Sequence, residues 1–244
     1  MMKKLNLILT VLLCGIFSLQ AQHLGNKKVK GNGHLTSEIR SVSDYDQIKV
    51  FGNLEVELVR GREGELKLQG EENLLEYIRT IVVGKSLKIK VKQGFDIRPS
   101  KNQMLIITVP FVDLNEISLA GSGGIYTSDV IKAVHLKTDL EGSGDIKLSL
   151  SANKLSASVS GSGDMVLDGS VDKFEGTLIG SGDIRAFKLK AKNAIASVTG
   201  SGDFQLTATS SLKADVMGSG DIYYKGNPGK VDKKVAGSGN ITNK

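Results

Sequence analysis

Five aspartates recur at nearly equal spacing in the second half of the chain, each closing a Gly-Ser-Gly-Asp tetrapeptide. They are Asp145, Asp164, Asp183, Asp203 and Asp221. Carboxylates of this kind can bind calcium, and a glycine-rich loop can hold a phosphate with its backbone amides. The tetrapeptide can also form the corner of a repeating structure, where glycine supplies the backbone shape and aspartate accepts hydrogen bonds. Phosphate binding, calcium binding and a structural corner are therefore the three alternatives.

Phosphate binding has the least support in the sequence. A phosphate loop usually lies between a strand and the N-terminus of a helix, and it usually carries a lysine. After each tetrapeptide the apolar alternation of a strand resumes at once, as with Ile146 and Leu148. No helix is therefore expected where the phosphate would need one.

Calcium is the stronger alternative, because stacked carboxylates repel one another and a cation between them would relieve the repulsion. Calcium takes about six to eight oxygen ligands, however, and one aspartate per repeat supplies too few unless backbone carbonyls converge. The nonapeptide calcium β-helix also has a much shorter period, about nine residues. We expect the aspartates to cap the backbone as an outward ladder, with no metal and no cofactor, and calcium remains the alternative.

The tetrapeptides repeat with a period of about nineteen residues. With the variants GSGG and GSGN included, the first glycines lie at 121, 142, 161, 180, 200, 218 and 237, so the steps run from 18 to 21 residues. Between corners the residues alternate with the period of a strand; Leu155, Ala157 and Val159 are separated by serines. Both glycines share the parity of this inward set. The glycines predicted to shape the corners are Gly142, Gly144, Gly161, Gly163, Gly180, Gly182, Gly200, Gly202, Gly218 and Gly220.

A stack of such coils predicts an all-β fold, a right-handed parallel β-helix over residues 41–244. One coil cannot bury enough apolar surface to fold alone, so each layer has to support its neighbours. We expect regular coils over 116–244 and less regular coils over 41–115. In the latter, Gly70 follows Gly52 by 18 residues and is expected at a coil corner. Residues 71–79 are expected to form a short helical turn.

The N-terminus is typical of an exported protein. A basic start, an apolar stretch too short to span a bilayer and Ala21 at the expected cleavage site predict a signal peptide over residues 1–21. Residues 22–40 are expected to be a flexible leader or cap. Cleavage would remove Cys14, the single cysteine, and no later stretch is long and apolar enough to cross a membrane. The expected location is the periplasm, the outer surface or the extracellular space.

The charge distribution argues against nucleic acid as a partner. The net charge is only +6, the basic residues are scattered apart from Lys27, Lys28 and Lys30, and tryptophan is absent. A nucleic-acid surface usually has a basic stripe with aromatic platforms. The expected partner is a cell-surface glycan or an envelope protein, and the sequence leaves the oligomeric state open.

Several segments together resemble one known family. They are "DYDQIKVFGNLEVELVRG", "GEENLLEYIRTIVVGKSLKIKV", "LIITVP" and the serial GSGD units. In order and in motif they are similar to the putative auto-transporter adhesin, head GIN domain family, of unknown function, from residue 44 to the C-terminus. The resemblance implies a right-handed β-helix in the cell envelope or outside it. It implies no established activity and supplies no functional residues.

Catalytic candidates are few. His23 and His34 fall in the expected leader, and His135 has outward parity. Some β-helices are polysaccharide lyases that use acidic clusters with an Arg or Lys base, and Arg185 is predicted to lie near Asp164 and Asp183 in the stack. We predict no catalytic residues and a secreted, non-catalytic β-solenoid, an adhesin or structural module of the cell envelope. The alternative is a polysaccharide-active, lyase-like enzyme on the same scaffold.

Overall fold

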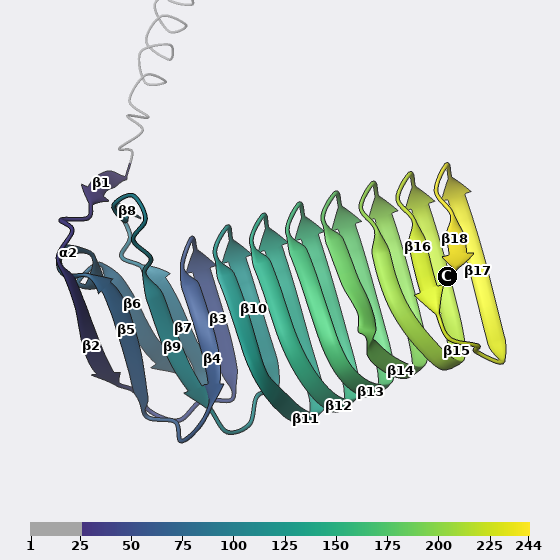
Figure 1. The fold of residues 1–244 in the computed structure, drawn as a ribbon, viewed down its shortest axis with the longest axis horizontal. Helices are drawn as coiled ribbons and strands as arrows, with labels where there is room; N and C mark the ends of the chain where they lie inside the picture. The colour runs from purple at the N-terminus through teal and green to yellow at the C-terminus, as the bar shows by residue number, and fades with distance from the viewer. Residues whose placement is uncertain (1–25) are drawn as a thin grey trace, which may run out of the picture.

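The structure, a computed structural model, describes residues 26–244 and shows a β-solenoid of about seven coils spaced by about 19 residues (Figure 1). The predicted all-β solenoid fold is confirmed, and so is the lower regularity of its N-terminal half. The predicted signal peptide lies outside the described residues, as do residues 22–25 of the predicted leader. No helix in the described part of the chain is long and apolar enough to cross a membrane.

Each regular coil is one long strand that bends around the core and ends at a corner. These strands are β11 (Gly124–Gly142), β12 (Asp145–Gly161), β13 (Asp164–Gly180), β14 (Asp183–Gly200) and β15 (Phe204–Gly218). Shorter strands complete the stack: β10 (Glu116–Gly121) before it, and β16 (Ile222–Lys225), β17 (Lys230–Gly237) and β18 (Ile241–Asn243) after it. All neighbouring strands in this region pair in parallel, with corner glycine opposite corner glycine. The corners therefore align along one edge of the solenoid, where the arrowheads line up in Figure 1.

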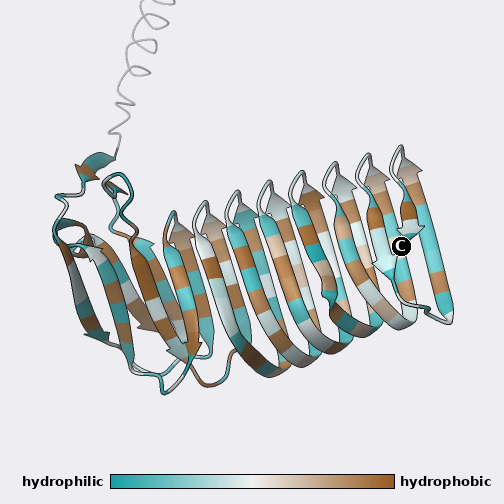
Figure 2. Cartoon of the chain, in the orientation of Figure 1, coloured by the Kyte–Doolittle hydropathy of each residue, from teal (hydrophilic) through white to brown (hydrophobic). Residues whose placement is uncertain are grey.

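The alternation seen in the sequence matches the burial in the structure. Leu155 and Val159 are fully buried, whereas the two serines between them are half-buried. Bands of opposite hydropathy follow one another along the strands (Figure 2). Inside the core, Gly176 leaves room for the ring of Phe204, which lies 5.8 Å from the ring of Phe174. The core is thus one continuous apolar column to which each coil adds a layer.

The N-terminal region has a different architecture. Its elements are β1 (Lys27–Lys30), β2 (Leu35–Ser41), β3 (Gln47–Gly52), β4 (Glu55–Arg60), β5 (Glu65–Glu71), α2 (Glu72–Leu75), β6 (Ile78–Val83), β7 (Ser86–Val91), β8 (Phe95–Arg98) and β9 (Ile106–Phe111). The strands β3 and β4 form a coil that lies between β7 and β9 on one side and β10 and β11 on the other. The chain therefore leaves the stack after β4, builds the N-terminal end and returns at β10.

Antiparallel strands close this end of the solenoid. β6 pairs antiparallel with β7, and β5 pairs antiparallel with both β9 and β2. Gly70 lies within β5 and faces Leu105, so the expected coil corner at Gly70 is not formed. The spacing from Gly52 resembles a coil period, but the sequence pattern of an antiparallel strand is also alternating, so the period alone could not distinguish the two. The expected helical turn is present as α2.

The described part of the expected leader carries β1 and β2, and side-chain contacts hold both its ends. The buried Glu71 carboxylate accepts hydrogen bonds from the amide of Gly33 (2.6 Å) and from the amide and hydroxyl of Ser100 (2.7 and 2.6 Å). The Ser100 hydroxyl and these amides lower the pKa of Glu71 because they stabilise its ionised form. Glu71 therefore ties the chain before β2 to the loop after β8.

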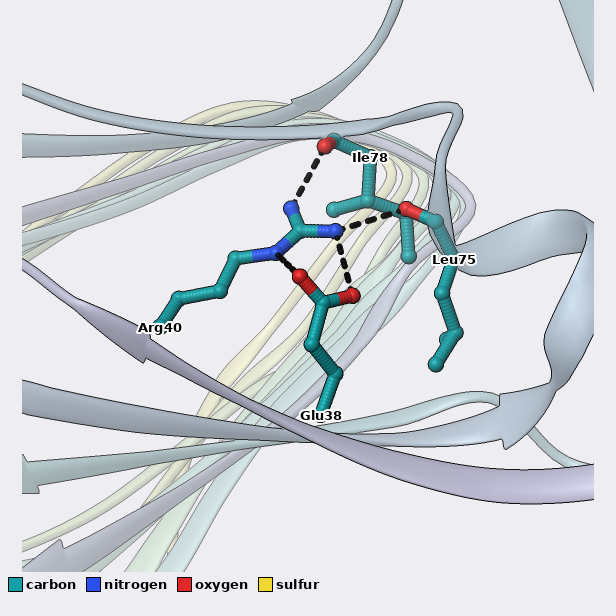
Figure 3. A network of polar contacts seen from close by, with 4 residues as sticks. All are labelled: Glu38, Arg40, Leu75 and Ile78. Carbon is teal, nitrogen blue, oxygen red and sulfur yellow. Dashed lines mark hydrogen bonds and ion pairs between the residues drawn. The ribbon is translucent and has the colours of Figure 1, made fainter.

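Arg40 makes the second set of contacts (Figure 3). Its guanidinium donates to the carbonyl oxygens of Leu75 (2.8 Å) and Ile78 (2.6 Å), and it forms a two-point pair with Glu38 (2.8 and 2.9 Å). The hydrogen bond from Arg40 lowers the pKa of Glu38. Arg40 thus joins β2 to the end of α2 and the start of β6, where the carbonyls of a helix end lack helical partners.

The C-terminal end of the stack is covered by a lysine. Lys233 has inward parity in β17, opposite Ala214. Its ammonium lies 4.7 Å from the centre of the Tyr224 ring and donates to the carbonyl oxygen of Ile241 (3.2 Å). The alkyl stem can shield the last apolar layer while the charged end stays in water.

Candidate functional site

The corner is built mainly from backbone hydrogen bonds. The carbonyl oxygen of Gly142 accepts the amides of Ser162 (2.8 Å) and Gly163 (3.1 Å) from the next coil, and the other corners repeat this pattern. The serine side chains are exposed at every corner. The serine thus contributes its amide to the corner, and the carbonyl of each first glycine joins one coil to the next.

The two glycines are needed for different reasons. Gly161 has φ = +124°, in the left-handed region that favours glycine, and a Cβ there would also collide with the carbonyl oxygen of Gly142. Gly163 has no such backbone angle, but a Cβ there would collide with the carbonyl oxygen of Gly144. The close approach of neighbouring coils therefore leaves no space for a side chain at either position.

The aspartates form a continuous column in register along the solenoid. The Oδ1 atom of Asp164 accepts the amide of Asp183 (3.1 Å), and that of Asp183 accepts the amide of Asp203 (3.0 Å). Asp203 accepts the amide of Asp221 (3.1 Å), and Asp221 accepts the amide of Asn240 (2.7 Å). From Asp164 onward, each carboxylate therefore caps the backbone of the following coil.

The column changes its hydrogen bonding at its N-terminal end. The amides of Asp145 and Asp164 donate to the carbonyl oxygens of Gly123 (3.0 Å) and Gly144 (3.1 Å) instead of to a carboxylate. In the preceding coil Gly124 occupies the aspartate position, and the carboxylate of Glu55 fills the space that a side chain would need there. Burial, with a smaller contribution from the charge of Asp145, raises the pKa of Glu55.

Arg185 and Tyr223 relieve the repulsion between stacked carboxylates. Arg185 lies between two coils and pairs with Oδ2 of Asp164 and with Oδ2 of Asp183, both at 2.9 Å. The hydroxyl of Tyr223 donates to Oδ2 of Asp221 (2.7 Å) and is the main cause of that carboxyl's lowered pKa. The predicted proximity of Arg185 to Asp164 and Asp183 is therefore present in the structure.

The surroundings of Arg185 are those of a surface ion pair. Its guanidinium is held by two carboxylates of neighbouring coils. Its side chain is 46% exposed on the outer edge of the coils. Among residues 26–244, no three His, Cys, Asp or Glu side chains converge as metal ligands. His34 and His135 are exposed.

A second feature runs parallel to the corners, three residues before each first glycine. The side chains at this position are polar in six successive coils and adjacent in register, and they are half-buried or exposed. We call this set the polar row: Ser118, Asp139, Ser158, Thr177, Ser197 and Asp215. Lys137 pairs with Asp139 (2.6 Å) and Lys213 lies 3.7 Å from Asp215, so the two carboxylates are neutralised.

The polar row leads to a cleft at the N-terminal end. In register it continues through Lys49 of β3 to Lys88 of β7. There the β1–β8 ribbon and the face of β3 and β7 line an open cleft of about 870 Å³. Its lining includes Lys28, Lys90 and Phe51.

Sequence reasoning missed this cleft because Lys28 and Phe51 are far in the chain from Lys88, Lys90 and Lys92. The alternation of Lys88, Lys90 and Lys92 within "SLKIKVK" was the available signal, since residues of one parity share a face of a strand. The parallel pairing of β1 with β8 then brings Lys28 to the same place. The basic residues are therefore less scattered in space than in sequence.

Comparison with known proteins assigns the chain to a family. The family described as "Putative auto-transporter adhesin, head GIN domain" matches residues 44–228, so the chain belongs to this family. A curated relative is not found. The chain is similar to the crystal structure of a putative adhesin from Bacteroides fragilis, with 28% identity, 88% of this chain and 100% of that chain covered, and a TM-score of 0.78.

Two proteins from Parabacteroides distasonis are also similar in structure. One is described as a putative lipid binding protein, with 30% identity, 89% of this chain and 100% of that chain covered, and a TM-score of 0.74. The other is a putative adhesin with 26% identity, the same coverage of both chains and a TM-score of 0.70. These similarities extend over nearly the whole solenoid and support the family assignment.

Proposed function

We propose that this protein is an exported, non-catalytic adhesin-like module that binds a glycan on a cell surface. The observation that carries the proposal is the polar row, which presents one hydroxyl or carboxylate per coil at a repeat of about 4.8 Å. An extended polymer lying along this row could hydrogen-bond to several coils at once, and each weak contact would add to the next. Family membership supports the same role.

The corner aspartates support a structural role rather than a catalytic one. From Asp164 to Asp221 their carboxylates accept amides of the next coil, so these groups are already engaged within the protein. In the polar row, Asp139 and Asp215 are paired with lysines, but the four hydroxyl side chains point away from the core. Binding is therefore assigned to the polar row and not to the Asp ladder.

Glycan arrays and whole-cell binding with residues 22–244 test the proposal. Replacing Ser158 and Thr177 with glutamine puts two bulky side chains in neighbouring coils of the row, and binding should fall by about tenfold if two or more contacts are lost. The matched control replaces Ser151 and Ser170, which are exposed and also adjacent in register. Equal binding by both variants would contradict the assignment to the polar row.

Export has its own measurement. Mass spectrometry of the secreted protein should find an N-terminus at Gln22 and no lipid, because the predicted cleavage follows Ala21. A lipid-modified N-terminus at Cys14 would show that the protein is anchored instead.

A further inference from the structure

The N-terminal cleft gathers positive charge that the described residues do not neutralise. Lys28, Lys88, Lys90 and Lys92 all line it. No ion pair within residues 26–244 involves any of these four lysines. Asp96 also lines the cleft, but its carboxylate is paired with Arg98 at 3.0 Å. The cleft therefore offers several ammonium groups to an anion from outside.

The placement of these lysines opposes the stability of the sheet. Lys88 lies directly beside Lys49 in β3, and Lys90 lies directly opposite Arg79 in β6. Like charges opposite one another destabilise a pair of strands. Lys49 has a partner in Glu116 (3.0 Å), whereas Lys88 and Lys90 have no ion-pair partner among the described residues. An anionic ligand would remove this repulsion, so binding and stability should be coupled.

Aromatic side chains border the same cleft. Phe51 is adjacent to Lys90 in register and is 39% exposed, which is high for a phenylalanine. Phe95 of β8 also lines the cleft, with its ring centre 4.6 Å from that of Tyr77. An aromatic ring can cover the apolar face of a sugar while the lysines bind its acidic groups.

We infer that the lysine cleft, defined by Lys28, Lys88, Lys90, Lys92 and Phe51, binds the carboxylate or sulfate groups of an acidic polysaccharide. The inference rests on the proposed glycan-binding function and names the ligand class. The polar row leads into the cleft through Lys49, so one linear chain can contact both. The cleft is open to solvent, and its volume of about 870 Å³ has room for a few sugar units of a longer chain.

Nucleic acid is the less favoured polyanion. A single strand is usually held by aromatic platforms for successive bases, and beyond Phe51 the row of side chains next to the corners continues with Ala120, Glu141 and Ser160. The charge along the polar row is also mixed rather than basic. These features favour a polyanion whose binding does not depend on stacked bases.

Calorimetric titration with defined polymers tests the inference. The probes are polygalacturonate for carboxylates, dextran sulfate for sulfates and dextran as the neutral polymer, each at low and at physiological ionic strength. The wild-type protein should bind one or both acidic polymers, more weakly as salt rises, and should bind dextran at least about tenfold more weakly. Binding should also raise the melting temperature.

The double variant Lys88→Gln/Lys90→Gln removes two charges from the cleft without a change in the core. Its affinity for the acidic polymer should fall by about tenfold, and its salt dependence should become shallower. The matched control is Lys188→Gln/Lys190→Gln, which removes two exposed lysines with the same spacing in β14. This control should change affinity by less than about twofold, since its charges lie several coils away from the cleft.

The outcomes separate this inference from the proposed function. Equal losses in the two double variants, or no binding of the wild type to either acidic polymer, would overturn the lysine cleft as the site. If such a protein still binds cells or neutral glycans, the proposed function stands without the inference. Stronger binding to phosphatidylglycerol vesicles or to single-stranded DNA, lost in Lys88→Gln/Lys90→Gln, would overturn the ligand class.

Discussion

Neighbouring segments are held together by different contacts in the regular coils and at the N-terminal end. In the coils, one rule is applied at every corner: the carbonyl of the first glycine accepts two amides of the next coil. At the N-terminal end, individual side chains such as Glu71 and Arg40 hold particular segments together. The regular coils therefore repeat one set of contacts, whereas the N-terminal end is held by individual side chains and carries the lysine-lined cleft.

The two regions also differ in whether neighbouring like charges have partners within the protein. In the Asp ladder, amides of the next coil and Arg185 compensate stacked carboxylates within the protein. In the lysine cleft, Lys88 and Lys90 have no such ion-pair partner in residues 26–244. Compensated charge is typical of structure, and uncompensated charge in a concave site is typical of binding.

The largest expected effect tests the cooperation between coils. Leu155→Asp places a carboxylate in the fully buried column, and each coil depends on its neighbours, so the free energy of unfolding should fall by roughly 4 kcal/mol or more. Urea denaturation followed by circular dichroism measures the loss. Ser151→Asp, at an exposed position beside Lys132, is the matched control and should change stability by less than about 0.5 kcal/mol. A comparable loss in the control would contradict the assigned core.

A second experiment separates crowding from backbone strain at the corner. In Gly161→Ala the added Cβ is placed on a backbone with a positive φ and also collides with the carbonyl oxygen of Gly142. The free energy of unfolding should therefore fall by about 3 kcal/mol or more. In Gly84→Ala, in the N-terminal region, the backbone also has a positive φ, but the added Cβ has no atom within 4 Å. The free energy of unfolding should fall by only about 1 kcal/mol. Both are measured by urea denaturation. Equal costs would show that the close approach of coils contributes nothing.

Acid should affect the N-terminal end through Glu71. Because the pKa of Glu71 is lowered in the folded protein, its contribution to stability is complete above its ordinary value of 4.5 and is lost as the pH falls through the lowered pKa. Glu71→Gln should lower the free energy of unfolding by about 2 kcal/mol at pH 7, because an amide cannot accept all three hydrogen bonds. The variant should also lose less stability than the wild type as the pH falls.

Denaturation midpoints at neutral and acidic pH measure both effects. Glu72→Gln is the neighbouring control, since Glu72 is exposed, and should lose as much stability at acidic pH as the wild type does. If Glu71→Gln loses as much stability at acidic pH as the wild type, the role given to this carboxylate is contradicted.

The smallest effect is expected at the Asp ladder. Asp164→Asn keeps an oxygen that can accept the amide of Asp183 and loses only a half-exposed pair with Arg185, so stability should change by less than about 1 kcal/mol. Thermal melts with calcium and with excess chelator measure it. A melting temperature that drops on chelation in the parent, and no longer responds in Asp164→Asn, would support calcium at the ladder instead of backbone capping.

The sequence by itself determined the solenoid. The steady spacing of the corner glycines and the inward parity of residues such as Leu155 and Val159 are local properties, and each coil repeats them. Because the rule is the same in every coil, one coil is enough to predict the next. The same parity placed the aspartates outward and Arg185 beside two of them.

Only the tertiary structure decided the N-terminal end and the cleft. Gly70 fits a coil period, yet the chain leaves the stack after β4, so β5 pairs antiparallel with β2 and β9. Lys28 and Lys90 are distant in sequence and line the same cleft because β1 pairs with β8 across from β7. Such contacts depend on long-range pairing that no local period encodes, and for that reason the basic cleft could not be recognised in a sequence whose charges look scattered.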